Sequence, residues 1–550
     1  MSKYIAVLLG LIQLGSITAG AQQSPQPKPH IERVGTHYRF LVDGKPFLIL
    51  GGQAHNSSAT NPQDLEPVWR SLIALHANTA EVPVYWELIE PQPGQYDFHL
   101  VDEILAGARR NHLRVVLLWF ASLHSSRTSG TLYAPEWVKR DKARFQRIAG
   151  PSGEEMEFLS PLCDAARVAD ARAFAALMKH LRQADEADRT VIMVQVENET
   201  GLVGTDRDYS PEATRRFAGP VPMELMNYLT EHREALTPSL KAAWAAVRFR
   251  PAGTWSEVFG ELAPEALSAL YIARYVDKVA EAGKQQYPLP MYVNGWLIQP
   301  GDVRAGQWPS GGPTEHVLDI WKAAAPHLDL IAPDIYFPKY KETCLTYARP
   351  DNPLFVPEVQ FFPPPHNAAN AFLTFAEFDG LGFSPFGIDD AAAEGKVNEK
   401  AAEFEDTYRV LNPLLDLIAA KQGSGKLHAI VQSEDEAQVV RLDGSLAAVV
   451  DFIKPYSTDG PRGRGMIVEL ARDDYAVVGA GFRVEFRELA GPPRDAQFLS
   501  LEEGTFEGER WIPTRRLNGD ELGDELKVPL TEKARILRVR LLREGVPSSH

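Results

Sequence analysis

The sequence is poor in cysteine and has no excess of positive charge. Its two cysteines, Cys163 and Cys344, allow at most one disulfide, and they are too far apart in the chain to belong to a metal-ligand cluster. Two buried thiols are an equally good interpretation. The net charge of −16 argues against nucleic acid as a partner, because phosphate-binding surfaces need clustered lysine and arginine. It also disfavours polyanionic substrates and leaves neutral sugars, peptides and small molecules.

Several other signatures are missing. No stretch beyond the first 21 residues is long and apolar enough to be a transmembrane helix, so we expect no membrane span. The sequence lacks the His-x-x-x-His and Cys-His spacings of catalytic metal sites and the Gly-x-Ser-x-Gly of serine hydrolases. We therefore expect no metal and no other cofactor.

The first residues have the pattern of a targeting segment. Lys3 precedes a short apolar run that ends in Ala19-Gly20-Ala21, an order typical of a secretory signal peptide over residues 1–21. A buried first helix is the alternative, but the polar, proline-bearing stretch that follows gives it nothing to pack against. We predict a linker at 22–34 and export to the periplasm or the extracellular space.

Short apolar runs alternate with longer helical patterns between residues 35 and 421. Continuously apolar strands separated by helices are typical of parallel strands buried on both faces, and eight such units indicate a (β/α)8 TIM barrel. An open doubly wound sheet is the runner-up, disfavoured because no Gly-x-Gly-x-x-Gly follows the first strand. The predicted strands are 47–51, 79–85, 115–120, 191–196, 291–294, 330–335, 355–359 and 382–386, and predicted helices include 100–111, 166–184 and 264–282.

Two further segments complete the predicted organisation. Residues 201–262 form an insertion that either shapes the catalytic face of the barrel, where loops after strands collect, or packs only on itself. After a break at 422–425, short alternating strands joined by turn residues predict a C-terminal antiparallel β-sandwich at 426–545. This domain has no evident nucleophile, so it either binds sugar or supports the barrel.

Acidic residues stand at the ends of two predicted strands. The fourth ends in Glu197-Asn198-Glu199, and the seventh carries a single carboxylate, Glu358, in an apolar run. Burial is costly for a carboxylate and raises its pKa, as a general acid at neutral pH requires. Glycosidic-bond hydrolysis needs two carboxyl groups that flank one sugar. Salt bridges inside the barrel are the alternative, and strand alternation does not choose between Glu197 and Glu199.

The position of these acids resembles that in the retaining (β/α)8 glycosidases. Residues 195–199 (QVENE) and 78–98 (NTAEVPVYWELIEPQPGQYDF) are more narrowly similar to glycoside hydrolase family 35, the β-galactosidases, and family 42 β-galactosidases share a related pattern. The resemblance covers about residues 35–400. It implies that Glu199 is the acid/base and that Glu358 is the nucleophile. It also implies that Asn198 binds the sugar 2-hydroxyl and that Tyr336 orients the nucleophile. A core tyrosine is the alternative for Tyr336.

The chain also departs from the commonest family members. Residues 118–122 (LWFAS) lack the acid that helps to hold galactose after the third strand, Glu87 replaces a usual asparagine, and residues 53–56 (QAHN) replace His-Tyr-Phe-Arg. These differences indicate a divergent bacterial branch with a C-terminal β domain, and they put the galactose contacts in doubt.

Other residues at predicted strand exits are candidates for substrate contact. The rings of Tyr85, Trp119 and Trp296 suit stacking on a pyranose, with core packing as the alternative for each. Asn294 and His55 are polar groups at similar positions.

Residues and resemblance together predict a retaining exo-glycoside hydrolase. Its substrate would be a neutral oligosaccharide or plant polysaccharide side chain with a terminal β-galactosyl residue, and its two catalytic carboxyl groups would lie about 5–5.5 Å apart. The alternatives are a relative with other specificity, such as a β-glucosidase, a β-mannosidase or an endo-acting enzyme, and a sugar-binding protein that has lost catalysis.

Overall fold

A computed structural model of the chain describes residues 27–126, 129–362, 366–458, 460–489, 494–521 and 527–543. The predicted signal peptide at 1–21 lies outside these residues. The second part of the predicted linker at 22–34 is a strand: β1 (His30–Val34) pairs with β2 (His37–Val42), which in turn pairs with β3 (Lys45–Pro46). Phe40 and Val42 of β2 are buried in the barrel core, which holds this small sheet in place.

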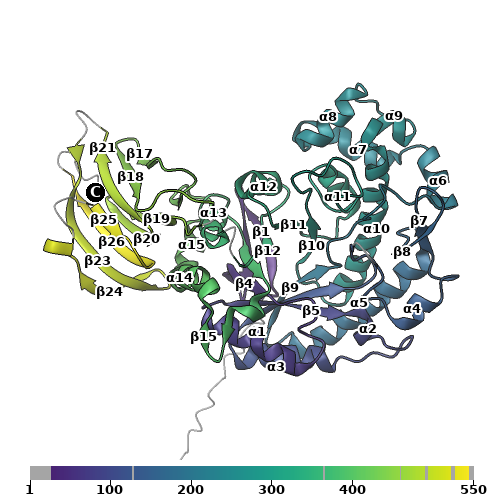
Figure 1. Ribbon diagram of the computed structural model, residues 1–550, viewed down its shortest axis with the longest axis horizontal. Helices are drawn as coiled ribbons and strands as arrows, with labels where there is room; N and C mark the ends of the chain where they lie inside the picture. Colours follow the sequence, from purple (N-terminus) through teal and green to yellow (C-terminus); the bar gives the residue numbers. More distant parts are fainter. Residues whose placement is uncertain are drawn as a thin grey trace, which may run out of the picture.

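Eight parallel strands close a barrel, as predicted (Figure 1). The strands follow one another around the ring in chain order, and the last pairs with the first. Nearly every strand residue is buried, because inward side chains fill the barrel and outward ones contact the helices. The strands are β4 (Ile49–Gln53), β5 (Thr79–Tyr85), β6 (Arg114–Phe120), β9 (Val191–Val196), β10 (Met291–Trp296), β11 (Leu330–Ile335), β12 (Val356–Gln360) and β13 (Gly382–Phe386).

Helices cover the outside of the barrel, and the three predicted examples are present as α3, α5 and α10. Helices α5 and α10 pack closely where Gly283 faces Phe174; a Cβ there would lie 2.3 Å from the ring. None of the helices in the described ranges is long and apolar enough to cross a membrane. The main helices are α1 (Pro62–Ala74), α3 (His99–Arg110), α5 (Asp164–Asp185), α10 (Ala263–Gln286), α11 (Leu318–Ala324), α12 (Tyr340–Tyr347), α13 (Asn370–Ala376), α14 (Ala402–Leu411) and α15 (Leu415–Lys421).

The two cysteines are buried, free thiols. Cys163 immediately precedes α5, and Cys344 lies in α12. Of the two interpretations of the pair, the structure supports separate buried thiols and not a disulfide.

The insertion at 201–262 packs on the barrel and not only on itself. It contains α6 (Pro211–Ala218), α7 (Met223–Glu231), α8 (Pro238–Ala246) and α9 (Trp255–Phe259), seen at the upper right of Figure 1. Helix α7 contacts α11, and α9 contacts α10. Its first residues are tied to the loop after β10, because Leu202 and Ser310 exchange backbone hydrogen bonds of 3.0 and 2.9 Å. A second excursion, between β6 and α5, holds α4 (Glu136–Arg140) and the hairpin of β7 (Arg147–Ala149) and β8 (Glu155–Leu159), which the sequence pattern did not predict.

The C-terminal domain is an antiparallel β-sandwich, as predicted. One sheet has the order β16-β19-β20-β26-β23-β24, and the other has the order β17-β18-β21-β22 with β25 beside β21. Its strands are β16 (Leu427–Val431), β17 (Gln438–Asp443), β18 (Leu446–Phe452), β19 (Arg464–Ala471), β20 (Asp474–Ala480), β21 (Phe482–Glu488), β22 (Arg494–Asp495), β23 (Gln497–Glu507), β24 (Arg510–Arg516), β25 (Lys527–Leu530) and β26 (Arg535–Leu542).

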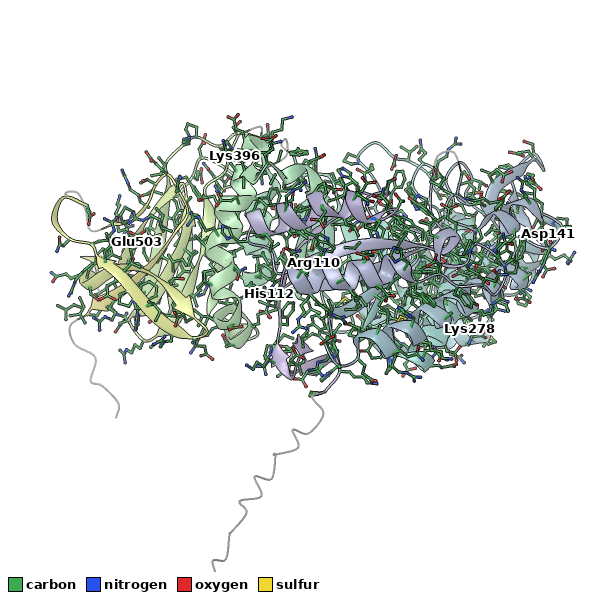
Figure 2. The ribbon with its side chains drawn as sticks, turned by 90° about the horizontal axis from the view of Figure 1, so that it is seen from below. Arg110, His112, Asp141, Lys278, Lys396 and Glu503 are labelled. Carbon is green, nitrogen blue, oxygen red and sulfur yellow. The ribbon has the colours of Figure 1, made fainter. Side chains whose placement is uncertain are left out.

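Strands β19 and β20 of the six-stranded sheet are buried on both faces. Along β19 and β20, Ile467 and Val477 belong to the core between the two sheets, whereas their neighbours Met466 and Val478 belong to the core shared with the barrel. Polar contacts join the same surfaces: Asp406 of α14 accepts from Arg464 of β19 at 2.9 Å and from the backbone N–H of Ala534. The sandwich therefore supports the barrel at α13 and α14. Figure 2 shows Glu503 of the sandwich and Asp141 of the barrel at opposite ends of the molecule.

Candidate active site

The two predicted catalytic glutamates meet at the C-terminal mouth of the barrel. Glu358 lies in β12, and Glu199 lies three residues beyond the end of β9. One carboxyl oxygen of each lies within 4.8 Å of the other, and both lie within 4.8 Å of an oxygen of Asp334 in β11. Glu358 and Asp334 are 5% and 1% exposed, while Glu199 is partly covered. Three acids from three strands thus face one small space.

Both oxygens of Glu358 accept hydrogen bonds. The Tyr336 hydroxyl donates to Oε2 at 2.6 Å, and the Gln53 amide donates to Oε1 at 2.6 Å. Burial raises the pKa of Glu358, and these two donors oppose that shift because they stabilise the ionised form. The position of Tyr336 agrees with the one implied by the resemblance. Gln53 was not predicted as a site residue, because β4 continues two residues past its expected end.

Glu199 is held by its backbone, which leaves its side chain to the site. Its N–H donates to Asn294 Oδ1 at 2.8 Å, and its carbonyl oxygen accepts from the Ser125 hydroxyl. Burial, followed by the charge of Glu358, raises the pKa of Glu199 well above its usual value, and a hydrogen bond with Asp334 opposes this. Two donors favour the ionised form of Glu358, so a proton on this pair is better placed on Glu199.

The predicted residues Asn198 and Asn294 form a network around Glu199. Asn294 donates to Asp334 at 2.8 Å and to Asn198 at 3.1 Å. Asn198 also contacts His124 Nδ1 at 3.3 Å. Burial lowers the pKa of His124 to about 4, so its imidazole is neutral near pH 7 and can accept from the Asn198 amide. These hydrogen bonds fix the orientation of the Asn198 and Asn294 side-chain amides beside Glu199.

Glu197 points away from the site. Glu197 and Glu199 would face the same way in a regular strand. However, β9 ends at Val196, and Glu197 has a φ of +64°. Its carboxyl group accepts from the backbone N–H of Leu123 at 2.9 Å, behind the end of β6. The structure therefore separates the two glutamates that alternation could not distinguish, and Glu199 is the one at the mouth.

Tyr85 lies in an aromatic cluster beside the mouth. Its ring contacts those of Phe120 and Tyr133, and its hydroxyl accepts from the Ala59 N–H at 3.3 Å. It is 3% exposed, so it forms part of a wall and not an open stacking platform. Tyr133 was missed because it lies in an irregular loop; burial raises its pKa to about 12, and the charge of Glu199 contributes.

The prediction that Trp119 contacts substrate is wrong. In β6, Trp119 pairs in register with Val84 and Val196 on the outer surface of the barrel. Its indole N–H donates to Asp170 of α5 at 2.9 Å, its ring packs on Phe174, and it is 0% exposed. Trp119 therefore belongs to the layer between barrel and helices.

The remaining two candidates lie at the rim. Trp296 lies two residues beyond Asn294 in β10 and pairs in register with Asp334, so it is on the inner side and only partly covered. The side chain of His55 is 43% exposed, and its Nδ1 lies 3.1 Å from Asp389 Oδ1. Both are placed where an extended ligand could reach them.

A further acid lies beneath the mouth. Glu81 in β5 is 0% exposed and lies beside Ser384 and Tyr292. Gly51 leaves room for Ser384, since a Cβ there would lie 2.4 Å from Ser384 Oγ. Burial raises the pKa of Glu81 well above its usual value. The sequence signal that could have indicated Glu81 and Asp334 is the same for both: an acid at an inward position of an apolar strand.

Oxygen-rich clusters of this kind also suit hard cations. Glu199, Asp334 and Glu358 can each offer one oxygen, and on the outside of the barrel Asp277 and Glu281 can each offer one oxygen beside a ring nitrogen of His327. In the first group both oxygens of Glu358 already accept hydrogen bonds, which makes a proton-transfer site the better interpretation.

A large cavity lies elsewhere on this face. It has a volume of about 1130 Å³ between α8 and the 303–308 loop, and Trp308, His316 and Glu265 are among its lining residues. None of the three mouth carboxylates lines it.

Sequence comparisons identify two regions of similarity. Residues 56–259 match the model of glycoside hydrolase family 42, described as β-galactosidase, and residues 404–529 match a domain of unknown function (DUF5597). The first match includes Glu199 but not Glu358. It supports a β-galactosidase-like barrel, while membership of family 35 specifically stays a prediction.

Individual relatives match over shorter stretches. A β-galactosidase from Xanthomonas manihotis is 27% identical over 202 residues, which are 36% of this chain and 31% of that protein. One from Felis catus is 28% identical over 222 residues, which are 39% and 31% of the two chains. The match therefore spans about a third of the length of these relatives. Among solved structures, a β-galactosidase from Rahnella sp. R3 has a TM-score of 0.45 at 14% identity, covering 70% of this chain and 58% of that one.

Proposed function

We propose that this chain is an exported, retaining exo-glycoside hydrolase that releases terminal β-galactosyl residues from neutral oligosaccharides or polysaccharide side chains. The observation that carries the proposal is the meeting of Glu199 and Glu358, 159 positions apart in the sequence, with carboxyl oxygens within 4.8 Å. Retaining glycosidases place their two carboxyl groups about 5–5.5 Å apart, whereas inverting enzymes need about 6.5–9.5 Å to admit a water molecule. The short separation favours retention.

The two acids have different surroundings, which supports different roles. Glu358 accepts two hydrogen bonds that favour its ionised form, as a nucleophile needs. Glu199 faces the charge of Glu358, and its hydrogen bond with Asp334 only partly opposes the effects of burial and of that charge, so it keeps the proton that a general acid must deliver. Residues whose environments push their pKa values apart divide the work of acid and nucleophile in this way.

The reaction then follows in two displacements. Glu358 attacks the anomeric carbon while Glu199 protonates the glycosidic oxygen, so the leaving sugar departs and a glycosyl–Glu358 ester forms. Glu199, now ionised, takes a proton from water, and the resulting hydroxide attacks the anomeric carbon and releases Glu358 as carboxylate. Two inversions give net retention.

Chemical rescue tests the assignment of roles. In Glu358→Gly, azide can enter the space of the missing carboxylate and convert a 2,4-dinitrophenyl β-galactoside to the α-galactosyl azide. In Glu199→Ala, the ester still forms from this activated substrate, and azide replaces water to give the β-galactosyl azide. Loss on the order of 10²-fold or more is expected for unactivated substrates in either variant.

Glu212→Ala is the matched control, because Glu212 is an exposed helix acid paired with Arg216. Wild-type-like turnover in either site variant, or the same azide anomer from both, would refute the roles. A panel of aryl β-galactosides, β-glucosides and β-mannosides tests the sugar, and the galactose assignment fails if another glycoside is cleaved much faster. Tight sugar binding with no turnover would indicate a binding protein.

A further inference from the structure

A second pair of acids lies directly behind the site. The carboxyl groups of Glu197 and of Asp170 in α5 are in hydrogen-bonding contact, and both residues are 0% exposed. Within the described part of the chain, neither forms a salt bridge with a lysine, arginine or histidine. Two carboxylates can only accept hydrogen bonds, so their contact requires a proton between them.

The surroundings of the pair supply donors but no charge. Trp119 of β6 donates to Asp170 Oδ1 at 2.9 Å, and the Tyr275 hydroxyl of α10 donates to Oδ2 at 3.3 Å. On the other side, the backbone N–H groups of Leu123 and Ser122 donate to Glu197 at 2.9 and 3.3 Å. Burial, then the charge of Asp170, raises the pKa of Glu197 well above its usual value, which favours the proton that the contact requires.

The pair is attached to an unusual backbone turn. Glu197 and Glu199 have φ values of +64° and +44°, a region that non-glycine residues seldom adopt without support from their surroundings. Gln195 donates to the Glu197 carbonyl oxygen at 2.9 Å, and Asn294 accepts from the Glu199 N–H. The outward-turned Glu197 side chain is a further anchor of the turn that carries Asn198 and Glu199 to the mouth.

We propose that the proton-sharing pair of Glu197 and Asp170 is a positioning device that locks the turn after β9 with Glu199 at the mouth, and that loss of the shared proton loosens this turn. This inference rests on the proposed function, because its effect is exerted through the general acid. Glu197 and Asp170 do not contact substrate.

Matched variants at position 197 test the positioning role. Glu197→Gln keeps the shape and one acceptor oxygen and replaces the shared proton by an amide N–H, so its activity should stay closer to wild type than that of Glu197→Met. Glu197→Met has a similar volume but cannot form the hydrogen bond. Its kcat should fall on the order of 10²-fold for phenyl β-galactoside, which needs the acid, and far less for the 2,4-dinitrophenyl substrate, which does not. Equal losses on both substrates, or a Gln variant as impaired as Met, would overturn the positioning role.

Thermal unfolding tests the shared proton without any sugar. Isolated carboxyl groups lose their protons near about pH 4, so the folded wild type binds more protons than the unfolded chain above that pH, and its Tm should fall as pH rises toward the folded pKa. The fall should be shallower in Glu197→Gln and in Asp170→Asn, which have no proton to lose there. Parallel curves would overturn proton sharing. Shallower curves in a chain that hydrolyses no glycoside would instead refute the proposed function and, with it, the positioning role.

Discussion

Carboxylates in the barrel mouth and in the C-terminal sandwich have opposite electrostatic surroundings. In the sandwich, Glu503 lies between Arg535 and Arg515 at 2.6 and 2.7 Å, and the hydrogen bond from Arg535, above all, holds the pKa of Glu503 below its usual value. In the mouth, Glu199 and Glu358 face each other and Asp334, and burial raises the pKa of all three. A carboxylate therefore stabilises the sandwich through paired charge, whereas in the mouth burial disfavours its ionised form.

The difference separates a structural from a reactive use of acidic residues. Paired surface acids contribute modestly to stability, whereas clustered buried acids cost free energy that the rest of the fold must offset. Such unfavourable arrangements concentrate at functional sites. In the sandwich, Glu503 has its charge paired across strands, whereas the barrel has uncompensated buried acids at strand ends, at inward strand positions and, as Asp170, on α5.

Replacing a mouth carboxylate should produce the largest effect. Glu199→Gln is expected to lower kcat/KM for phenyl β-galactoside on the order of 10²-fold or more, because the general acid is lost. Wild type should lose Tm between pH 5 and pH 8, and Glu199→Gln should lose less Tm over the same interval. The pKa of Glu199 is higher in the folded than in the unfolded protein, so its proton stabilises the folded wild type and that stabilisation is lost as pH rises toward the folded pKa. The glutamine side chain does not titrate and contributes no such loss.

Glu503→Gln is the matched change in the sandwich and should act in the opposite direction. The pKa of Glu503 is lower in the folded than in the unfolded protein, so its ionised form stabilises the fold at pH values above the unfolded pKa. The variant lacks this contribution and should have a lower Tm than wild type at pH 8. Tm changes of the same sign in both variants would remove the contrast between the domains.

Breaking the contact between the domains should have the next largest effect. Arg464→Met removes one of the two cations that pair with Asp406, the other being Arg409 of α14, and the loss of such a charged hydrogen bond costs about 2 kcal/mol. Urea unfolding followed by tryptophan fluorescence measures it. The folded variant should keep its kcat, since the interface lies at the helices and not at the mouth; a proportional loss of kcat at low temperature would show that the sandwich contributes to the site.

Tyr336→Phe should change activity less than loss of either glutamate. The hydroxyl donates to Glu358 and lowers its pKa, so its removal should shift the acid limb of the pH dependence of kcat/KM to higher pH. The rate at the optimum should fall roughly 10- to 100-fold, the range for one hydrogen bond to a charged group. An unshifted acid limb would show that the limb does not report Glu358.

The smallest effect is expected at the sandwich surface. The side chain of Arg515 is 52% exposed, and Arg535 also pairs with Glu503, so solvent and a second cation replace most of the contact in Arg515→Ala. The urea midpoint should not change measurably. A loss comparable to that of Arg464→Met would mean that surface pairs, and not the buried contact, hold this domain.

The arrangement of strands could be read from the sequence because it depends on local pattern. Apolar runs such as 191–196 are long enough and uniform enough to be parallel strands, and all eight were predicted within a few residues. Alternation also bears on Trp119: it is adjacent in sequence to Phe120, so the two rings face opposite sides of the strand, and only one can lie at the mouth. Gln53 was missed because its strand runs past the last apolar residue.

Local pattern failed where regular structure ends. Glu197 and Glu199 would share a face in a continued strand, and the left-handed φ values that separate them depend on partners contributed by the loop after β6, by α5 and by β10. Tyr133 and His124 come from the same irregular loop and carry no periodic signal. The linker prediction was wrong for residues 30–34 for a similar reason, since the strand at His30–Val34 exists through its pairing with β2.

The sequence by itself determined the eight strands, the change to a sandwich and the presence of acids at the ends of the fourth and seventh strands, because hydrophobicity and its period are properties of neighbouring residues. Only the tertiary structure decided which acids face one another. Closing the barrel brings together Glu199, Asp334 and Glu358 from separate strands and turns Glu197 toward Asp170, and burial at those positions sets which carboxyl group holds a proton.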